Sequence, residues 1–171
     1  MKKLTNKGKV INLGCRLNFF ESEIIENILK KEKGVKKIVI NTCAVTNNAV
    51  QKSMQAVKKA LKDYPSSEVI VTGCASQIEK NRFKNLKNIS KIVDNKFKTN
   101  PYSYTKNKKV KEENFTFPPI DFLSTDRTRA MLQIQQGCNH RCTFCIIPYG
   151  RGDAVSLPFS EIFKRVEKIL S

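Results

Sequence analysis

The stretch KIVINTC, residues 37–43, is a short run of β-branched residues that ends in a cysteine. Two other stretches have the same form, KVINLGC at residues 9–15 and EVIVTGC at residues 68–74. Runs rich in Val and Ile and bounded by polar residues or glycine are typical of strands buried on both faces. A weaker run, KIVDN, follows at residues 91–95. The first part of the chain therefore contains several short strands, three of which end in a cysteine.

Helix-like segments separate these strands. Residues 21–33 follow Asn18-x-x-Glu21, which resembles a capping box, and residues 47–63 carry apolar residues at steps of three and four. The alternation of strands with helices predicts an α/β fold, an open parallel sheet built from right-handed βαβ units.

The six cysteines fall into two groups of three: Cys15, Cys43 and Cys74, then Cys138, Cys142 and Cys145. Loops beyond the carboxyl ends of neighbouring parallel strands converge on one crevice, so we expect the first group to meet in space. Cysteines in a reducing compartment do not normally form disulfides, so both groups point to metal or redox chemistry.

The composition predicts a cytoplasmic protein. Hydrophobic residues make up 40% of the chain and the mean hydropathy is −0.41. The basic start MKKLTNKGKV is not followed by an apolar stretch of signal-peptide length. No run approaches the about 18 consecutive apolar residues that a membrane-spanning helix needs, so no membrane association is expected.

The net charge of +17 makes nucleic acid the first candidate partner. Residues 80–111 hold 11 Lys or Arg and a single acid, Asp94. However, 25 of the 32 basic residues are lysine, a bias that an A/T-rich genome also produces. Charge alone therefore leaves nucleic-acid binding and simple compositional bias equally open.

The alternation of strand and helix is lost at residues 97–126, whose lysine runs and prolines predict a linker between domains. The predicted domains are residues 1–96 and residues 127–171. The second contains a predicted strand at 129–136 and a predicted helix at 160–170. One strand and one helix cannot bury a core alone, so this unit either docks on the first domain or is truncated.

The second cysteine group, Cys138-x-x-x-Cys142-x-x-Cys145, can wrap one face of an iron–sulfur cubane. A fully ligated [4Fe–4S] cluster takes four cysteines, so three leave one iron with an open position for a reactant. The alternative is a structural zinc site with His140 as fourth ligand. Zinc motifs usually pair two short hairpins, and His140 lies inside the loop, which disfavours that alternative.

Four motifs together resemble the methylthiotransferase family of the radical S-adenosylmethionine superfamily. They occur in the family's order and cover nearly all of residues 9–171: LGCRLNFFESE (13–23), NTCAVTNNA (41–49), TGCASQ (72–77) and GCNHRCTFCIIPYGRG (137–152). The resemblance implies an N-terminal methylthiotransferase domain with an open parallel sheet. After it comes the first βα unit of a radical S-adenosylmethionine partial barrel that is truncated.

The same resemblance implies two [4Fe–4S] clusters and S-adenosylmethionine as cofactors. The cluster on Cys138, Cys142 and Cys145 would bind S-adenosylmethionine through its open iron and, on reduction, generate a deoxyadenosyl radical. The cluster on Cys15, Cys43 and Cys74 would supply the methylated sulfur. The implied partners are tRNA and a reducing electron-transfer protein, while no oligomeric state is implied.

Supporting residues are predicted around both groups. Phe144 is expected beside the adenine of the cofactor or in plain loop packing. Arg151 is expected to contact the cofactor or RNA phosphate, or to be a solvated loop residue. Asn18, Asn41 and Thr42 are expected either to donate hydrogen bonds to cluster sulfide or to act as turn and cap residues.

The substrate branch is indicated by Arg16, which follows Cys15, and by Ala44-Val45-Thr46. These residues are similar to the branch that acts on N6-threonylcarbamoyladenosine next to the tRNA anticodon. The alternatives are isopentenyladenosine in tRNA, a ribosomal protein, or a non-catalytic iron–sulfur or RNA-binding module.

The chain departs from the family pattern in two respects. It stops after the first βα unit, without the rest of the barrel or the RNA-gripping domain, so we expect it to be inactive alone. In addition, Ser156-Leu157 stands where the family commonly has Ser-Arg, which removes one expected contact to the cofactor or phosphate.

Overall fold

The computed structural model describes residues 8–32, 34–105, 115–123 and 129–170, and its centre is a four-stranded sheet. Every neighbouring pair of strands in this sheet is parallel. The strands follow one another in chain order: β1 (Lys9–Asn12), β2 (Lys37–Thr42), β3 (Glu68–Gly73) and β4 (Lys91–Ile92). The α/β class and the open parallel sheet predicted from the sequence are confirmed.

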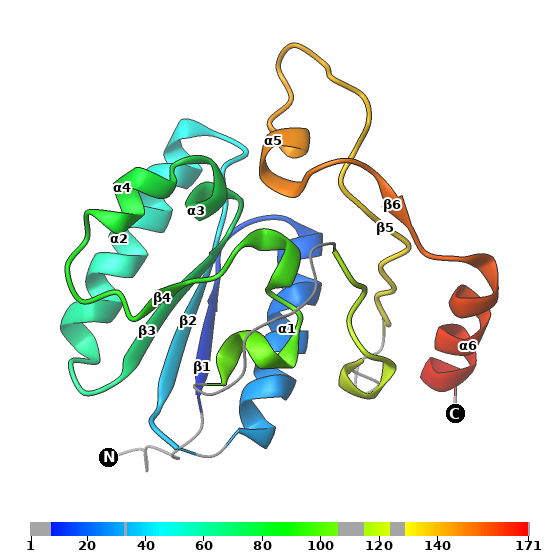
Figure 1. Cartoon of the computed structure of the whole chain (residues 1–171), viewed down its shortest axis with the longest axis horizontal. Helices are drawn as coiled ribbons and strands as arrows, with labels where there is room; N and C mark the ends of the chain where they lie inside the picture. Colours follow the sequence, from blue (N-terminus) through cyan, green and yellow to red (C-terminus); the bar gives the residue numbers. More distant parts are fainter. Residues whose placement is uncertain (1–7, 33, 106–114, 124–128, 171) are drawn as a thin grey trace.

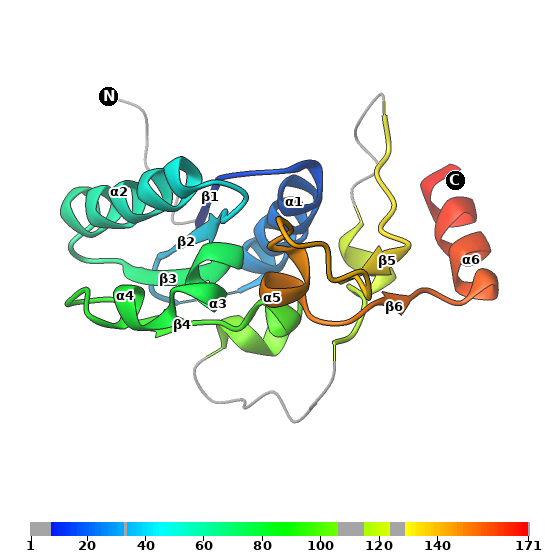
Figure 2. The same cartoon turned by 90° about the horizontal axis from the view of Figure 1, so that it is seen from above.

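Helices cover both faces of the sheet (Figures 1 and 2). Successive strand residues point to opposite faces, so Val39 joins the core under α1 (Arg16–Lys31), while Ile38 packs on the other face. That other face is covered by α2 (Asn47–Asp63) and α4 (Lys80–Lys84). The short helix α3 (Cys74–Ile78) follows β3 at once, at the carboxyl edge of the sheet. The predicted helix over residues 47–63 is confirmed.

The start of α1 differs from the prediction. The helix begins at Arg16 rather than at residue 21, and its N-cap is Cys15, which makes no side-chain cap hydrogen bond. The predicted capping box of Asn18 and Glu21 is wrong, because both residues lie inside the helix and are buried. Their side chains bond to distant parts of the chain instead of capping the helix locally.

Part of the predicted linker packs on the α1 face of the sheet. The short 3₁₀ turns η1 (Asn95–Phe97), η2 (Pro101–Tyr104) and η3 (Ile120–Phe122) follow β4. Tyr104 is fully buried in the core with α1 and donates a hydrogen bond from its hydroxyl to the Lys98 carbonyl at 2.6 Å. Residues 106–114 and 124–126 of the linker lie outside the described residues. The proposed domain boundaries stay a prediction.

The last part of the chain contains two short strands and two helices: β5 (Gln135–Gln136), α5 (Ile147–Arg151), β6 (Val155–Ser156) and α6 (Phe159–Leu170). The helix predicted near the end is confirmed. The strand predicted over residues 129–136 is wrong except for its last two residues. Among the described residues β5 pairs only with β6, in an antiparallel ladder two residues long, and this limits its length.

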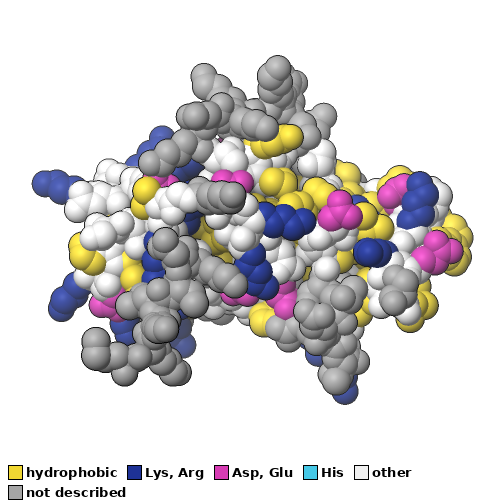
Figure 3. All heavy atoms as spheres, turned by 90° about the horizontal axis from the view of Figure 1, so that it is seen from below, with side chains coloured by type: hydrophobic (Ala, Val, Ile, Leu, Met, Phe, Trp, Pro, Cys, Tyr) yellow, Lys and Arg dark blue, Asp and Glu magenta, His cyan; other side chains and the backbone are white. Residues whose placement is uncertain are grey.

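Helix α6 projects from the rest of the molecule (Figure 1) and exposes an apolar stripe that includes Phe159, Phe163 and Leu170. Its Arg165 is buried and donates to the Pro118 carbonyl at 2.8 Å, which ties the helix to the preceding segment. Figure 3 shows hydrophobic side chains at this end of the molecule and Lys and Arg side chains at several separate places. None of the described helices has both the length and the apolar character needed to cross a membrane.

Replacing Gly73 tests how closely the sheet edge is packed. Gly73 has φ +98°, and a Cβ there would lie 2.3 Å from the Thr42 carbonyl oxygen and 2.5 Å from the Thr42 nitrogen. We expect Gly73→Ala to lower the free energy of unfolding by at least about 3 kcal/mol, from backbone strain plus overlap. Urea unfolding followed by circular dichroism measures this loss.

Gly34→Ala is the matched control, because Gly34 also has positive φ, +122°, but among the described residues, its chain neighbours aside, no atom lies within 4 Å of its Cβ position. Only backbone strain then contributes, and a loss of about 1 kcal/mol is expected. Equal losses in the two variants would contradict the close approach of Gly73 to β2.

Candidate iron–sulfur site

Cysteines of the first group all stand at the carboxyl edge of the sheet. Cys15 is the N-cap of α1, Cys43 directly follows β2, and Cys74 is the first residue of α3. The strands that precede them are paired in register, with Asn12 opposite Asn41 and Thr42 opposite Gly73. The predicted convergence at one edge is therefore what the topology produces.

Glycines give two of these cysteines room. A Cβ on Gly14 would lie 2.9 Å from the Sγ of Cys43, and a Cβ on Gly150 would lie 3.3 Å from the Sγ of Cys74. Gly14 also has φ +136°, in the region that favours glycine. Cys43 is buried, Cys15 is exposed, and Cys74 is intermediate between them. The edge thus presents thiols at three levels of exposure, and a glycine lies close to two of them.

The second cysteine group lies in one loop that the β5–β6 ladder closes. The Cys138 amide donates to the Gly152 carbonyl at 3.1 Å, and the Cys145 amide donates to the Cys142 carbonyl at 3.0 Å. Cys142 is exposed, whereas Cys138 and Cys145 are partly buried. Three thiols on a loop that is held at both ends are suited to ligating one cluster from one side.

Helix α5 brings the second loop onto the sheet edge that carries the first group. It packs against α3 and η1, above the carboxyl ends of the strands in Figure 1. Asn95 joins the two parts, because its Nδ2 donates to the Gly150 carbonyl at 2.6 Å and to the Cys74 Sγ at 3.4 Å. The sequence left open whether the second unit docks on the first, and the structure shows that it does.

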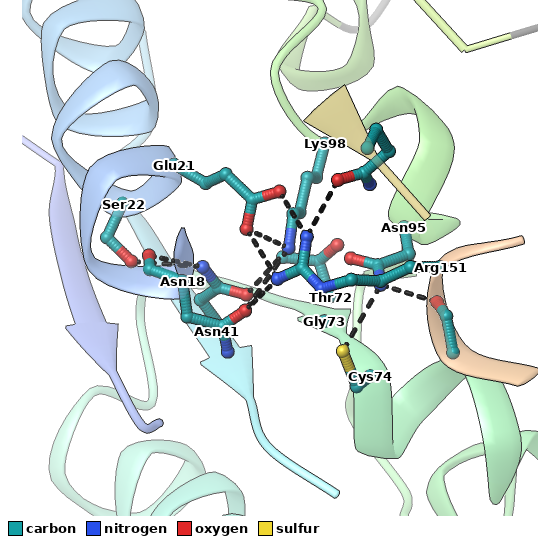
Figure 4. Close-up of polar contacts among 12 residues, drawn as sticks. Asn18, Glu21, Ser22, Asn41, Thr72, Gly73, Cys74, Asn95, Lys98 and Arg151 are labelled. Atoms are coloured by element: carbon teal, nitrogen blue, oxygen red, sulfur yellow. Dashed lines mark hydrogen bonds and ion pairs between the residues drawn. The ribbon is translucent and has the colours of Figure 1, made fainter. Parts of the chain in front are cut away.

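A buried charge cluster lies next to this contact (Figure 4). The Nζ of Lys98 is 2.5 Å from Glu21 Oε2. Arg151 donates from Nη1 to Glu21 Oε1 at 2.8 Å and from Nη2 to Glu21 Oε2 at 3.0 Å. The side chains of Glu21 and Lys98 are each 1% exposed, and that of Arg151 is 5% exposed. One buried carboxylate therefore pairs with two basic side chains.

These charges shift each other's pKa values. Burial opposes ionisation of Glu21, but Lys98 and Arg151 outweigh it and hold the pKa of Glu21 below the ordinary value of 4.5. Burial also opposes the charge of Arg151, yet Glu21 first, then Cys74 and Cys15, raise the pKa of Arg151 above its usual range. Burial lowers the pKa of Lys98, although Glu21 opposes the shift. The carboxylate and the guanidinium are thus both charged at neutral pH.

Three residues predicted as possible sulfide donors form the polar framework around this cluster. Asn18 donates from Nδ2 to the carbonyls of Leu13 at 3.1 Å and Thr42 at 2.9 Å. Asn41 donates from Nδ2 to the Asn18 carbonyl at 2.9 Å, and the Thr42 hydroxyl donates to the Thr72 carbonyl at 2.6 Å. These donors bind backbone carbonyls at the strand ends and, for Asn41, in the first turn of α1, in keeping with the structural alternative for Asn18, Asn41 and Thr42.

The remaining predicted residues lie on the second loop. Phe144 is 91% exposed, so its ring is not used in packing. Arg151 is not a solvated loop residue, since its side chain is 5% exposed and its terminal nitrogens bond to Glu21, to Asn18 Oδ1 at 2.6 Å and to Gln136 Oε1 at 2.9 Å. His140 is exposed. The contacts of Phe144 and Arg151 with a cofactor stay predictions.

Both cysteine groups have the donor chemistry of an iron–sulfur site. All six cysteines are free thiols, and the first group has the positive charge of Lys98 and Arg151 and an amide donor from Asn95 close by. These groups complement the negative charge of a cubane held by three thiolates. Within the described residues no three Cys, His, Asp or Glu side chains are already arranged to hold a metal ion.

Sequence reasoning missed the roles of Glu21, Lys98 and Asn95. A signal for Glu21 was present, because it lies at helical spacing with the buried Ile24, Ile25 and Ile28 of α1. An acid on the buried stripe of a helix requires a partner. No comparable signal marks Lys98, which lies in a lysine-rich stretch of no clear periodicity.

Comparison with known proteins places the chain among proteins named for methylthio transfer. A family model described as "Uncharacterized protein family UPF0004" matches residues 7–94. The threonylcarbamoyladenosine tRNA methylthiotransferase MtaB of Rickettsia prowazekii is 36% identical over 96% of this chain and 40% of its own length. The protein of the same name from Bacillus subtilis is 32% identical over 92% of this chain and 39% of its own length.

Relatives named for a different substrate, a ribosomal protein, have a similar sequence identity to this chain. The ribosomal protein uS12 methylthiotransferase RimO of Klebsiella pneumoniae strain 342 is 34% identical over 99% of this chain and 41% of its own length. The chain thus spans about two fifths of the length of the curated relatives it matches.

The buried carboxylate predicts a specific acid sensitivity. Because the pKa of Glu21 is lower folded than unfolded, its contribution to stability is fully present above about pH 4.5 and is lost as the pH falls through the folded value. Glu21→Gln removes this dependence and, at neutral pH, costs about 3–5 kcal/mol by leaving buried cations unpaired. We expect the stability difference between the parent chain and the variant to be constant from pH 7 to about 5 and to shrink below that.

Urea unfolding at several pH values measures this difference. Glu161→Gln is the control, because Glu161 pairs with Lys164 on the exposed surface of α6. A stability difference for Glu21→Gln that does not change down to pH 2 would contradict the pairing of the ionised carboxylate.

Proposed function

The chain belongs to the methylthiotransferase family that contains the UPF0004 domain, and from this membership we propose a function in tRNA modification. The proposed reaction is methylthiolation of N6-threonylcarbamoyladenosine next to the anticodon, driven by S-adenosylmethionine and two [4Fe–4S] clusters. The observation that supports the proposal is the docking of α5, which follows the loop of the second cysteine group, on α3 and beside Cys74 of the first group.

Each cysteine group has a distinct part in this proposal. Cys138, Cys142 and Cys145 hold a cluster from one side, and Cys15, Cys43 and Cys74 hold the other. When bound, the clusters supply electron transfer to S-adenosylmethionine and a site for the sulfur that is transferred. The exposed ring of Phe144 is free to stack on an adenine, and its position directly before Cys145 keeps it next to the second cluster site.

The substrate proposal is supported by exposed residues near Cys15 and Cys43. Arg16 is exposed on the first turn of α1, and Val45, two residues after Cys43, is 63% exposed. By contrast, Ala44 is buried, and Thr46 caps α2 by accepting from the Ala49 amide at 3.1 Å. Of the residues that mark the branch, Arg16 and Val45 are therefore the ones in a position to contact a substrate. The net charge of +17 suits an RNA.

A ribosomal protein is the second candidate substrate, because relatives named for uS12 match with 34% identity against 31–36% for those named for tRNA. Isopentenyladenosine in tRNA is a third. A non-catalytic iron–sulfur or RNA-binding module differs from all three, because it predicts cluster loading without methylthio transfer.

Iron content tests the two-cluster proposal. Anaerobic reconstitution should load about eight irons per chain, because each cysteine group would hold one cubane. Cys142→Ala and Cys43→Ala should each reduce this to about four, and the double variant to nearly none. Iron and sulfide assays with Mössbauer spectra give the counts. Stoichiometric zinc without iron uptake would instead identify a structural zinc site.

Nucleoside mass spectrometry tests the substrate. Residues 1–171 and a full-length reading frame that contains them are each expressed in a bacterium that lacks its own enzyme for threonylcarbamoyladenosine, and tRNA hydrolysates are analysed for the methylthio product. We expect that product from the full-length frame, its loss when that frame carries Cys142→Ala, and none from residues 1–171 alone. Methylthiolated isopentenyladenosine or methylthiolated ribosomal protein uS12 would redirect the substrate assignment, and cluster loading without any product would favour the non-catalytic module.

A further inference from the structure

The contact between α5 and the sheet depends on charges from three separate segments. Glu21 comes from α1, Lys98 from the turn after β4, and Arg151 from the end of α5. Figure 4 shows the three side chains pointing toward one another beside the strand end that carries Cys74. Arg151 alone comes from the loop of the second cysteine group, so it is the charge that ties this loop to the rest of the molecule.

We propose that Arg151 is a clamp: its paired bonds to Glu21 fix the second cysteine loop on the sheet edge and thereby set the separation between the two cysteine groups. The fork of Arg151 uses both Glu21 oxygens, at 2.8 and 3.0 Å, and reaches Asn18 and Gln136 as well. Bidentate geometry fixes orientation as well as distance. Arg151 is thus a positioning residue, because it acts through the loop that it holds.

The other side-chain bonds of this loop differ from those of Arg151 in charge, burial or the segment that they reach. Asn95 bonds to the Gly150 carbonyl, but it makes a single neutral contact there. Arg141 pairs with Asp153, but both residues belong to the loop itself and are 54% and 75% exposed. Exposed ion pairs contribute little to stability, whereas a buried pair is costly to break. Among the described residues, Arg151 is therefore the buried charge that crosses from the loop to the sheet.

Removing Glu21 and removing Arg151 leave different sets of buried charges. Without Glu21, two buried cations face each other unpaired. Without Arg151, Glu21 keeps Lys98 at 2.5 Å, which is a balanced buried pair. Removing Arg151 should therefore release the loop while the sheet and α1 stay folded. Arg151→Gln therefore removes the clamp selectively, because the core between α1 and the sheet should stay packed.

Hydrogen–deuterium exchange on the metal-free chain tests the clamp without reference to activity. The Gly150 amide donates to the carbonyl of Ile146, the N-cap of α5, and the Gly152 amide donates to the carbonyl of Pro148 within α5. In Arg151→Gln we expect these amides to exchange at least about tenfold faster, while the amides of β2 and β3 are unchanged. Arg151→Lys keeps the charge but loses the fork, so its exchange rate should lie between those of the parent and Arg151→Gln.

Arg141→Gln is the matched control, since it removes an exposed arginine–carboxylate pair from the same loop, and it should leave the exchange of α5 unchanged. Unchanged exchange of α5 in Arg151→Gln would overturn the proposal. Faster exchange throughout the sheet would also overturn it, because Arg151 would then be a core stabiliser rather than a clamp.

The consequence for the two cysteine groups rests on the proposed function and needs a second readout. In reconstituted, dithionite-reduced protein, magnetic coupling between two nearby clusters broadens the electron paramagnetic resonance signal. We expect Arg151→Gln to retain full iron content but to lose this broadening, and Arg141→Gln to retain both. Broadening that persists in Arg151→Gln would overturn the link between clamp and separation. A parent chain that loads no iron would count against the proposed function, while the exchange result would still judge the clamp.

Discussion

The carboxylate of Glu21, held between Lys98 and Arg151, is the contact on which the arrangement of the two cysteine groups depends. A carboxylate that is 1% exposed is costly to bury, and two cations at 2.5 and 2.8 Å compensate for that cost. Lys98 and Arg151 belong to separate segments of the chain, so their pairing with Glu21 brings those segments together. Burial of one acid thus obliges the turn after β4 and the end of α5 to meet at α1.

The same cluster has electrostatic consequences for the sulfur sites. The basic side chains of Arg151 and Lys98 lie beside Cys74, and the pKa of Arg151 is raised by Glu21 first and then by its electrostatic interaction with Cys74 and Cys15. Cys15 also caps the N-terminus of the 16-residue helix α1, where the helix dipole favours negative charge. A cluster held by three thiolates is negative, so charge and backbone act in the same direction. The site is therefore prepared for an anionic group before any metal binds.

Local patterns predicted most of the first core. Runs of Val and Ile identified β1 to β3, apolar spacing identified α2, and the parallel order of the strands followed from their alternation with helices. That order also predicted that cysteines 28 to 31 residues apart share one sheet edge. The prediction succeeded because hydrophobic periodicity is a local property. It repeats along each strand and helix and can therefore be read from a single sequence. Methylthiotransferase membership was likewise readable from the four cysteine motifs.

The buried contacts among segments far apart in the chain were not readable in this way. Asn18 and Glu21 have the spacing of a capping box, yet Glu21 bonds to Arg151, 130 residues away, and Lys98 belongs to a stretch that otherwise reads as a linker. An ion pair leaves no periodic trace in the sequence, and its partners are chosen by which segments the packed core brings within about 3 Å. Strands, helices and the shared cysteine edge were thus set by local composition and periodicity. The docking of the second loop was decided by folding, because only a water-excluded interior makes pairing of these three charges obligatory.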